Sequence, residues 1–141
     1  MMHFQLVSSQ GTKYDDEAYE VIVPTQGGTI SIFEDHMPLI SAAKPGVLSV
    51  RKKQNDHDSQ LENFAINGGV IEVDAKEVKF VADDITTEDE VSEQEATAAL
   101  ARAEELVKNA DSQTALQEAH RVLHHSSARL HLSQMKKRHH R

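Results

Sequence analysis

The sequence predicts an α+β protein, in which an N-terminal antiparallel β-sandwich of seven to ten strands precedes a C-terminal antiparallel hairpin of two helices. Two observations carry this prediction. From residue 2 to about residue 83, short apolar runs alternate with polar residues, and turn residues recur at intervals of about 8–12 residues. Beyond Asp84 the apolar spacing becomes helical. We therefore expect a sandwich over residues 1–84 and a hairpin over residues 85–141.

The expected strands follow one another closely along the first 83 residues. Alternation marks Phe4 and Leu6 near the start, and then Tyr19, Val21 and Val23. The later candidates are Ile30 with Ile32, a segment near Leu39, and residues 47–50, 61–66, 70–73 and 78–81. Residues 52–59 are polar throughout, which is typical of a solvated hairpin loop.

The helical half begins at one of two capping signals, Thr87-x-x-Glu90 or Ser92-x-x-Glu95. Residues 109–112 indicate the break between the helices, and a second helix is expected from Gln113 to Gln134 or beyond. Alanines and single leucines supply most of the apolar positions. Such a small apolar area barely offsets the entropy of ordering the chain, so we expect a mobile hairpin.

Charge is distributed unevenly along this chain of net charge −8. All 23 carboxylates lie in residues 1–118, whereas residues 119–141 carry six Lys/Arg and six of the nine histidines. Such a basic tail favours an acidic partner surface. The absence of cysteine excludes disulfides and thiolate metal sites. No P-loop or nucleophile elbow is present, and no apolar run is long enough to span a bilayer, so we expect neither catalysis nor direct membrane insertion.

An ordered set of turn and strand motifs resembles a known family. The motifs are Pro-Thr-Gln-Gly-Gly-Thr-Ile-Ser-Ile-Phe-Glu-Asp-His-Met-Pro-Leu at residues 24–39, Pro-Gly at 45–46 and Gly-Gly-Val-Ile-Glu-Val at 68–73. In this order they resemble the epsilon subunit of bacterial F-type ATP synthases. The resemblance implies a non-catalytic central-stalk subunit of a proton- or sodium-translocating complex. It also implies a peripheral location on the cytoplasmic side of the cell membrane.

The same resemblance implies which surfaces meet partners. The sandwich is expected to bind the gamma subunit and, through His36, Met37, Pro38 and Leu39, the c-ring. The second helix is expected to reach the alpha and beta subunits of the catalytic head and restrain ATP hydrolysis. The residues expected to act in that helix are Arg121, Arg129, Lys136, Lys137 and Arg138.

Some members of this family bind ATP on the folded hairpin through an Asp and several arginines. The positions that match here are Asp83, Ser92, Glu95, Arg102, His125 and Arg129. Ser92 replaces the expected Asp, Glu95 replaces an Arg, and His125 replaces another. A carboxylate in place of a cation repels a triphosphate. We therefore expect no bound ATP and no other cofactor.

Two alternatives come from other classes of protein. His120 and His124 stand four residues apart and His131 follows seven later, so a metal-responsive binding module is one alternative. Zinc sites need three or four protein ligands, and without a Cys or a suitably spaced carboxylate we expect no metal there. The basic run 136–141 suggests nucleic-acid binding, but the acidic body and scarce aromatic residues favour a partner other than nucleic acid.

Overall fold

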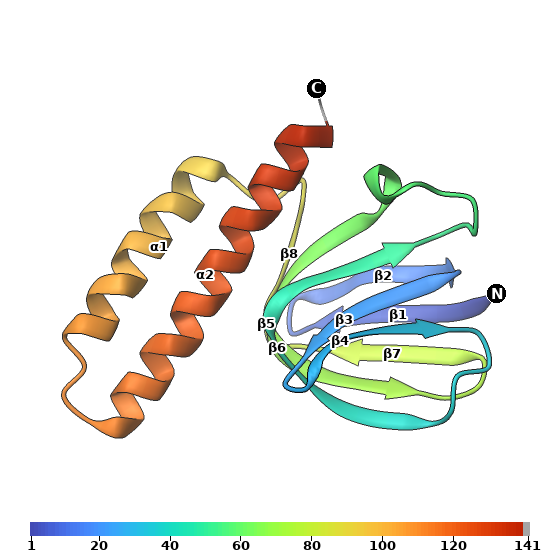
Figure 1. The fold of residues 1–141 in the computed structure, drawn as a ribbon, viewed down its shortest axis with the longest axis horizontal. Coiled ribbons are helices and arrows are strands. Elements are labelled where there is room, and N and C mark those ends of the chain that lie inside the picture. Colours follow the sequence, from blue (N-terminus) through green and yellow to red (C-terminus); the bar gives the residue numbers. More distant parts are fainter. Residues whose placement is uncertain (140–141) are drawn as a thin grey trace.

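The computed structural model describes the backbone of residues 1–139 and the side chains of residues 1–135. A β-sandwich comes first and two antiparallel helices follow, as the sequence predicted (Figure 1). The strands are β1 (Met2–Ser8), β2 (Gly11–Ala18), β3 (Glu20–Thr25), β4 (Gly28–Phe33), β5 (Leu39–Arg51), β6 (Glu62–Val73), β7 (Glu77–Val81) and β8 (Ile85–Thr87). One 3-10 turn, Asp58–Gln60, lies in the predicted polar loop.

The strands form one sheet in the order β2-β1-β7-β6-β5-β3-β4, with β8 paired to β6. β1 and β7 are parallel, whereas the other pairs among the described residues are antiparallel. The long strands β5 and β6 curve, so the sheet folds over itself into two layers (Figure 1). Their bends face each other, because Pro45 pairs with Asn67 and Ala43 pairs with Gly69.

Gly69 shows why this bend needs glycine. Its φ is +144°, and a Cβ atom there would lie 2.5 Å from the carbonyl oxygen of Val81 and 2.7 Å from the ring of Phe80. Neither the backbone conformation nor the space admits a side chain. The Gly-Gly motif therefore fixes the close approach of β6 and β7 where the sheet bends.

The core lies between the two layers. Phe4, Leu6, Phe64 and Phe80 are completely or almost completely buried. Tyr14 joins them, with its ring 5.5 Å from that of Phe4 and its hydroxyl donating to the carbonyl of Glu17 at 2.8 Å. Aromatic side chains thus fill the centre of a sandwich that contains few of them.

Two strands went unpredicted. β2 is an edge strand whose sequence, Gly-Thr-Lys-Tyr-Asp-Asp-Glu-Ala, buries only Tyr14 and Ala18, so its hydrophobic alternation is too sparse to detect. β8 is three residues long and follows the domain division that we predicted after residue 84. Its Ile85 is 2% exposed and belongs to the sandwich core.

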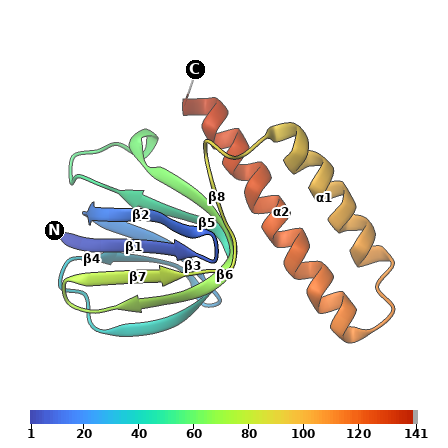
Figure 2. The same cartoon turned by 180° about the vertical axis from the view of Figure 1, so that it is seen from behind.

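The hairpin consists of α1 (Glu93–Lys108) and α2 (Gln113–His139). Ser92 is the N-cap of α1, and its hydroxyl accepts a hydrogen bond from the Glu95 amide. The second of the two predicted capping signals therefore starts the helix, and the predicted break separates the two helices. α2 lies against the sandwich and α1 lies on its outer side (Figures 1 and 2). No helix in the described residues is long and apolar enough to cross a membrane.

A small second apolar cluster joins the hairpin to the sandwich. Ala128 and Leu132 of α2 pack on Ala65 of β6 and on Val91, with Val47 of β5 at the margin. Two alanines, one valine and one leucine bury much less apolar area than the sandwich core does. At about 25 cal/mol per Å² this cluster contributes less than the sandwich core does, and the expected mobility of the hairpin stays a prediction.

Candidate functional site

The corner between β4 and β5 exposes the residues predicted to meet the c-ring. Asp35 adopts a left-handed conformation with φ 63°, and its amide donates to the carbonyl of Ala75 at 2.9 Å. This bond ties the corner to the β6–β7 turn. Met37 is 79% exposed, whereas Leu39 is partly buried against the core. The corner therefore presents an unburied apolar side chain on an anchored backbone.

A row of apolar side chains crosses the outer face of the sheet. Register places Ala42 of β5 opposite Val70 of β6, Val70 opposite Val81 of β7, and Val81 opposite Val7 of β1. Val70 and Val81 are 41% and 45% exposed. We call Val7, Ala42, Val70 and Val81 the apolar row. Four adjacent apolar residues on a solvent-facing sheet are typical of a surface that binds another protein.

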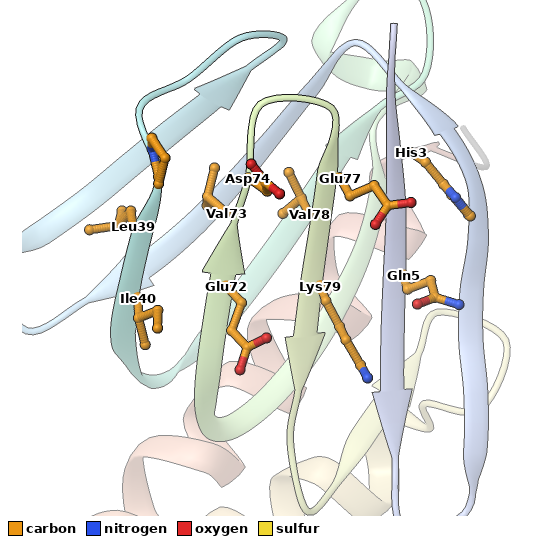
Figure 3. Close-up of a pocket in the computed structure, with 11 residues that line it drawn as sticks. His3, Gln5, Leu39, Ile40, Glu72, Val73, Asp74, Glu77, Val78 and Lys79 are labelled. Carbon is orange, nitrogen blue, oxygen red and sulfur yellow. The ribbon is translucent and has the colours of Figure 1, made fainter.

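One row nearer to the corner at residues 36–39, the same face carries charged side chains. Ile40, Glu72, Lys79 and Gln5 form the next row, with Ile40 76% exposed and Glu72 directly opposite Lys79. These four residues also line an open cavity of about 890 Å³. Figure 3 shows these side chains spread across β5, β6, β7 and β1. The cavity is lined by His3, Gln5, Pro38, Leu39, Ile40, Glu72, Val73, Asp74, Glu77, Val78 and Lys79.

Carboxylates outnumber cations in this cavity. Glu72, Asp74 and Glu77 face one lysine, Lys79, and one histidine, His3. A partner that covers the face must therefore bring apolar groups to the apolar row and basic groups to the cavity.

His3 is the titratable group with a perturbed pKa on this face. Its Nε2 is hydrogen-bonded to the carboxylate of Asp15 on β2. This bond is the main cause of a raised pKa at His3; burial opposes it, and the charges of Asp15, Glu17 and Glu77 add to it. The acidic surroundings therefore favour the protonated imidazole.

Polar contacts hold the segment between β8 and α1 to the sandwich. The buried amide of Asn63 accepts from Ser49 at 2.5 Å and donates to Glu88 at 2.9 Å. Glu90 lies 3.2 Å from Nζ of Lys13 and accepts from the hydroxyl of Thr87 at 2.8 Å. Hydrogen bonds from Thr87 and Lys13 lower the pKa of Glu90, although burial opposes this. These contacts hold the chain to the sandwich as far as Glu90.

A hydrogen bond between two side chains connects α2 to the end of the sandwich. Nε2 of His125 lies 3.0 Å from Oδ2 of Asp84. Nδ1 of His125 and Nε of Arg129, one turn later, are buried and have no hydrogen-bond partner in the described part of the chain. An unpaired buried donor or acceptor costs about 1–3 kcal/mol.

The positions that match the ATP motif differ in their burial and contacts. The Ser92 side chain caps α1, while Asp83, Glu95 and Arg102 are exposed. His125 and Arg129 are the partly buried members. The hydrogen bond of His125 is made with Asp84 and not with Asp83. The expectation that ATP does not bind stays a prediction.

The cations expected to act in the inhibitory helix all lie on α2. Arg121 is exposed, and its Nε lies 3.5 Å from the carbonyl oxygen of Asn67 at the β6 bend. Arg129 is partly buried. Lys136, Lys137 and Arg138 belong to α2, but their side chains lie outside the described residues.

The histidines of the metal alternative share one side of α2. The rings of His120 and His124 are 6.2 Å apart, and both residues are exposed. Within the described residues no group of three or more His, Cys, Asp or Glu is placed to hold a metal ion. The basic run of the nucleic-acid alternative lies outside the side chains that the structure describes.

Sequence reasoning missed the apolar row. The signal was present, because the pairs Val70-Ile71 and Phe80-Val81 place apolar residues on both faces of β6 and β7. A half-buried strand normally keeps one face polar. When a strand at the surface of a sandwich carries apolar residues on its outer face as well as its inner face, a partner is expected to cover the outer face.

Together, these elements define a class of small protein in which a β-sandwich carries a helical hairpin packed against it. The family model for the ATP synthase delta/epsilon chain, β-sandwich domain, matches residues 1–88. The ATP synthase epsilon chain of Neisseria meningitidis is 33% identical over 130 residues, covering 92% of this chain and 91% of that protein. The chain belongs to the family of ATP synthase epsilon chains.

Further similarities agree with this family. The epsilon chain of Gloeobacter violaceus is 33% identical over 129 residues, covering 92% of this chain and 94% of its own length. Among solved structures, a chain of the Euglena gracilis mitochondrial ATP synthase has a TM-score of 0.75 at 15% identity, covering 90% of this chain and 78% of that one. A chain of the Tetrahymena thermophila mitochondrial ATP synthase has a TM-score of 0.61 at 17% identity, covering 91% and 92%. The two structures support the fold.

Proposed function

We propose that this protein is a central-stalk subunit of a proton- or sodium-translocating F-type ATP synthase, where it couples rotation to ATP synthesis. The observation that carries the proposal is the apolar row across β5, β6, β7 and β1. These side chains lie outside the core of the sandwich, so the fold itself does not require them to be apolar. Family membership supplies the partner class. We place the protein at the cytoplasmic side of the cell membrane, as a peripheral part of the complex.

The gamma subunit is the partner proposed for the apolar row and the adjoining cavity. Val70, Val81 and Ile40 supply exposed apolar surface, and the three carboxylates of the cavity supply negative charge. Such an arrangement suits a partner with an apolar centre and a basic margin. Burial of the row against gamma would remove apolar surface from water.

The corner at residues 36–39 is proposed to contact the c-ring. Met37 extends from a backbone that the Asp35–Ala75 hydrogen bond holds in place. Methionine adapts its shape to a neighbouring apolar surface. Because the corner adjoins the cavity through Pro38 and Leu39, one continuous surface can serve both partners.

The hairpin is proposed as a regulatory unit separate from the sandwich, which acts by leaving it and reaching the alpha and beta subunits. Its small apolar cluster and two unpaired buried nitrogens favour release. The tethers at Glu88 and Glu90 keep the sandwich intact when the helices move. In the extended form the basic end of α2 would approach acidic loops and restrain ATP hydrolysis.

The test is capture of this chain from detergent-solubilised membranes of its source at low salt. Alpha, beta and gamma subunits should be recovered together with it. A Val81→Glu variant expressed in the same cells should lose them, whereas Leu106→Glu, on the exposed side of α1, should retain them. Recovery of the chain without ATP synthase subunits at low salt would overturn the proposal.

A further inference from the structure

Two adjoining cavities lie where α2 crosses the bends of β5 and β6. One has a volume of about 350 Å³ and lies beside Asn67 and Gly68. The other has a volume of about 380 Å³ and lies beside Lys44. Both are lined by Pro45 and His124, so they meet there. We call the combined space the seam trough, because one wall comes from the sandwich and the other from the hairpin.

Basic side chains gather in the seam trough. Lys44 comes from β5, while His120, Arg121, His124 and His131 come from α2. No carboxylate is among the described residues that line either cavity. In a chain of net charge −8, a space lined by two permanent cations and three imidazoles is a local reversal of charge. Such a space attracts anions.

Arg121 is held in position to bind a ligand. Its Nε donates to the carbonyl of Asn67 at 3.5 Å, which uses one of the five guanidinium N–H groups. One Nη atom lies 4.0 Å from the place that a Cβ on Gly68 would occupy. Gly68 has a φ of +110° and no side chain, so the space beside the guanidinium stays open. A planar group with several free N–H donors matches the oxygens of a phosphate.

We propose that the seam trough is a binding site for a phosphate group, with Arg121 and Lys44 as its charged ligands and His120 and His124 as further donors. His125 and Arg129, which occupy the ATP-motif positions, line neither cavity, so the site is distinct from that motif. A phosphate bound between α2 and the sandwich stabilises the docked hairpin, because the site loses its α2 side chains when the helices leave. This regulatory consequence rests on the proposed function, whereas binding to the isolated chain does not.

The experiment titrates the full-length chain with inorganic phosphate at constant ionic strength, using calorimetry and the NMR signals of the histidine rings. We expect saturable binding, with shifts at His120 and His124 and none at His57 in the distant polar loop. Arg121→Gln and Lys44→Gln should each weaken binding by roughly tenfold or more, because each removes a charge-assisted contact. Lys108→Gln, a 74% exposed cation at the end of α1, should leave the affinity unchanged.

Three results would overturn the site. The first is a linear response to phosphate that sodium chloride reproduces. The second is equal affinity in the wild-type and Arg121→Gln proteins. The third is saturable binding of ATP or Zn²⁺ without binding of inorganic phosphate, which would mark a nucleotide or metal site instead. None of these results bears on recovery of the chain with ATP synthase subunits, so the proposed function would stand.

Discussion

Nε2 of His125 in α2 lies 3.0 Å from Oδ2 of Asp84, at the point where the chain leaves the last long strand of the sandwich. The His125 side chain is 15% exposed and the Asp84 side chain is 48% exposed. This contact joins the hairpin to the sandwich, in addition to the apolar cluster that contains Ala128 and Leu132.

Asp84→Asn should loosen the hairpin without unfolding the sandwich. Because Asp84 is half exposed, solvent screens the pair and its loss costs about 1 kcal/mol at most. Hydrogen exchange of α2 amides should speed up, while that of β6 and β7 should stay unchanged. Asp83→Asn, at an exposed neighbouring carboxylate, is the control. Equal exchange in both variants would show that the hydrogen bond does not hold the hairpin.

Truncation tests where the sandwich ends. A chain of residues 1–90 should fold, because it retains β8 and the contacts of Glu88 and Glu90. A chain of residues 1–84 loses the buried side chain of Ile85, and its free energy of unfolding should fall by about 1.5–3 kcal/mol. Urea unfolding of the two chains measures the difference. Equal stability would mean that β8 is dispensable and that the division lies at residue 84.

The hydrogen bond between His3 and Asp15 should make part of the stability depend on pH. The pKa of His3 is raised in the folded protein, so the bond contributes fully below the unfolded pKa and is lost as the pH rises through the folded one. Asp15→Asn should bring the pKa of His3 back toward its ordinary value, because the bond is the main cause of the shift. Glu77→Gln removes a smaller contribution and should lower it less. NMR titration of the imidazole measures both, and an unchanged pKa in Asp15→Asn would rule out the assigned cause.

The alternation of apolar and polar residues predicted most of the strands and the hairpin. This was possible because the buried side chains of each strand or helix recur at a regular spacing within that segment. Val21, Val23 and Ile32 are fully buried at the expected positions. The apolar row escaped prediction because it depends on strand register, including the pairing of β1 with β7, which lie far apart in sequence. The His125–Asp84 pair escaped for the same reason, since 41 positions separate its members. β2 was missed because it buries only Tyr14 and Ala18, which leaves too little alternation to detect.

Charge reversal of the basic end of α2 should raise ATP hydrolysis by the assembled complex. The variant changes Lys136, Lys137 and Arg138 to Glu and leaves Arg129 intact, because its buried Nε belongs to the docked form. Exposed pairs contribute about 0.2–1 kcal/mol each, so single changes should act weakly and the triple change clearly. Raised salt should mimic the triple change. Lys108→Glu is the control, and equal hydrolysis rates at low salt for wild type and the triple variant would remove the inhibitory role.

The affinity of this chain for the gamma subunit of the same complex tests the central claim most directly. Immobilised gamma should bind the wild-type chain and the Leu106→Glu variant equally, because Leu106 lies on α1 and is 53% exposed. Val81→Glu places a charge in the middle of the apolar row at a 45% exposed position. Loss of such a central contact costs at least about 2 kcal/mol, so the affinity should fall by roughly thirtyfold or more. Unchanged affinity in Val81→Glu, with both variants folded by circular dichroism, would contradict the account.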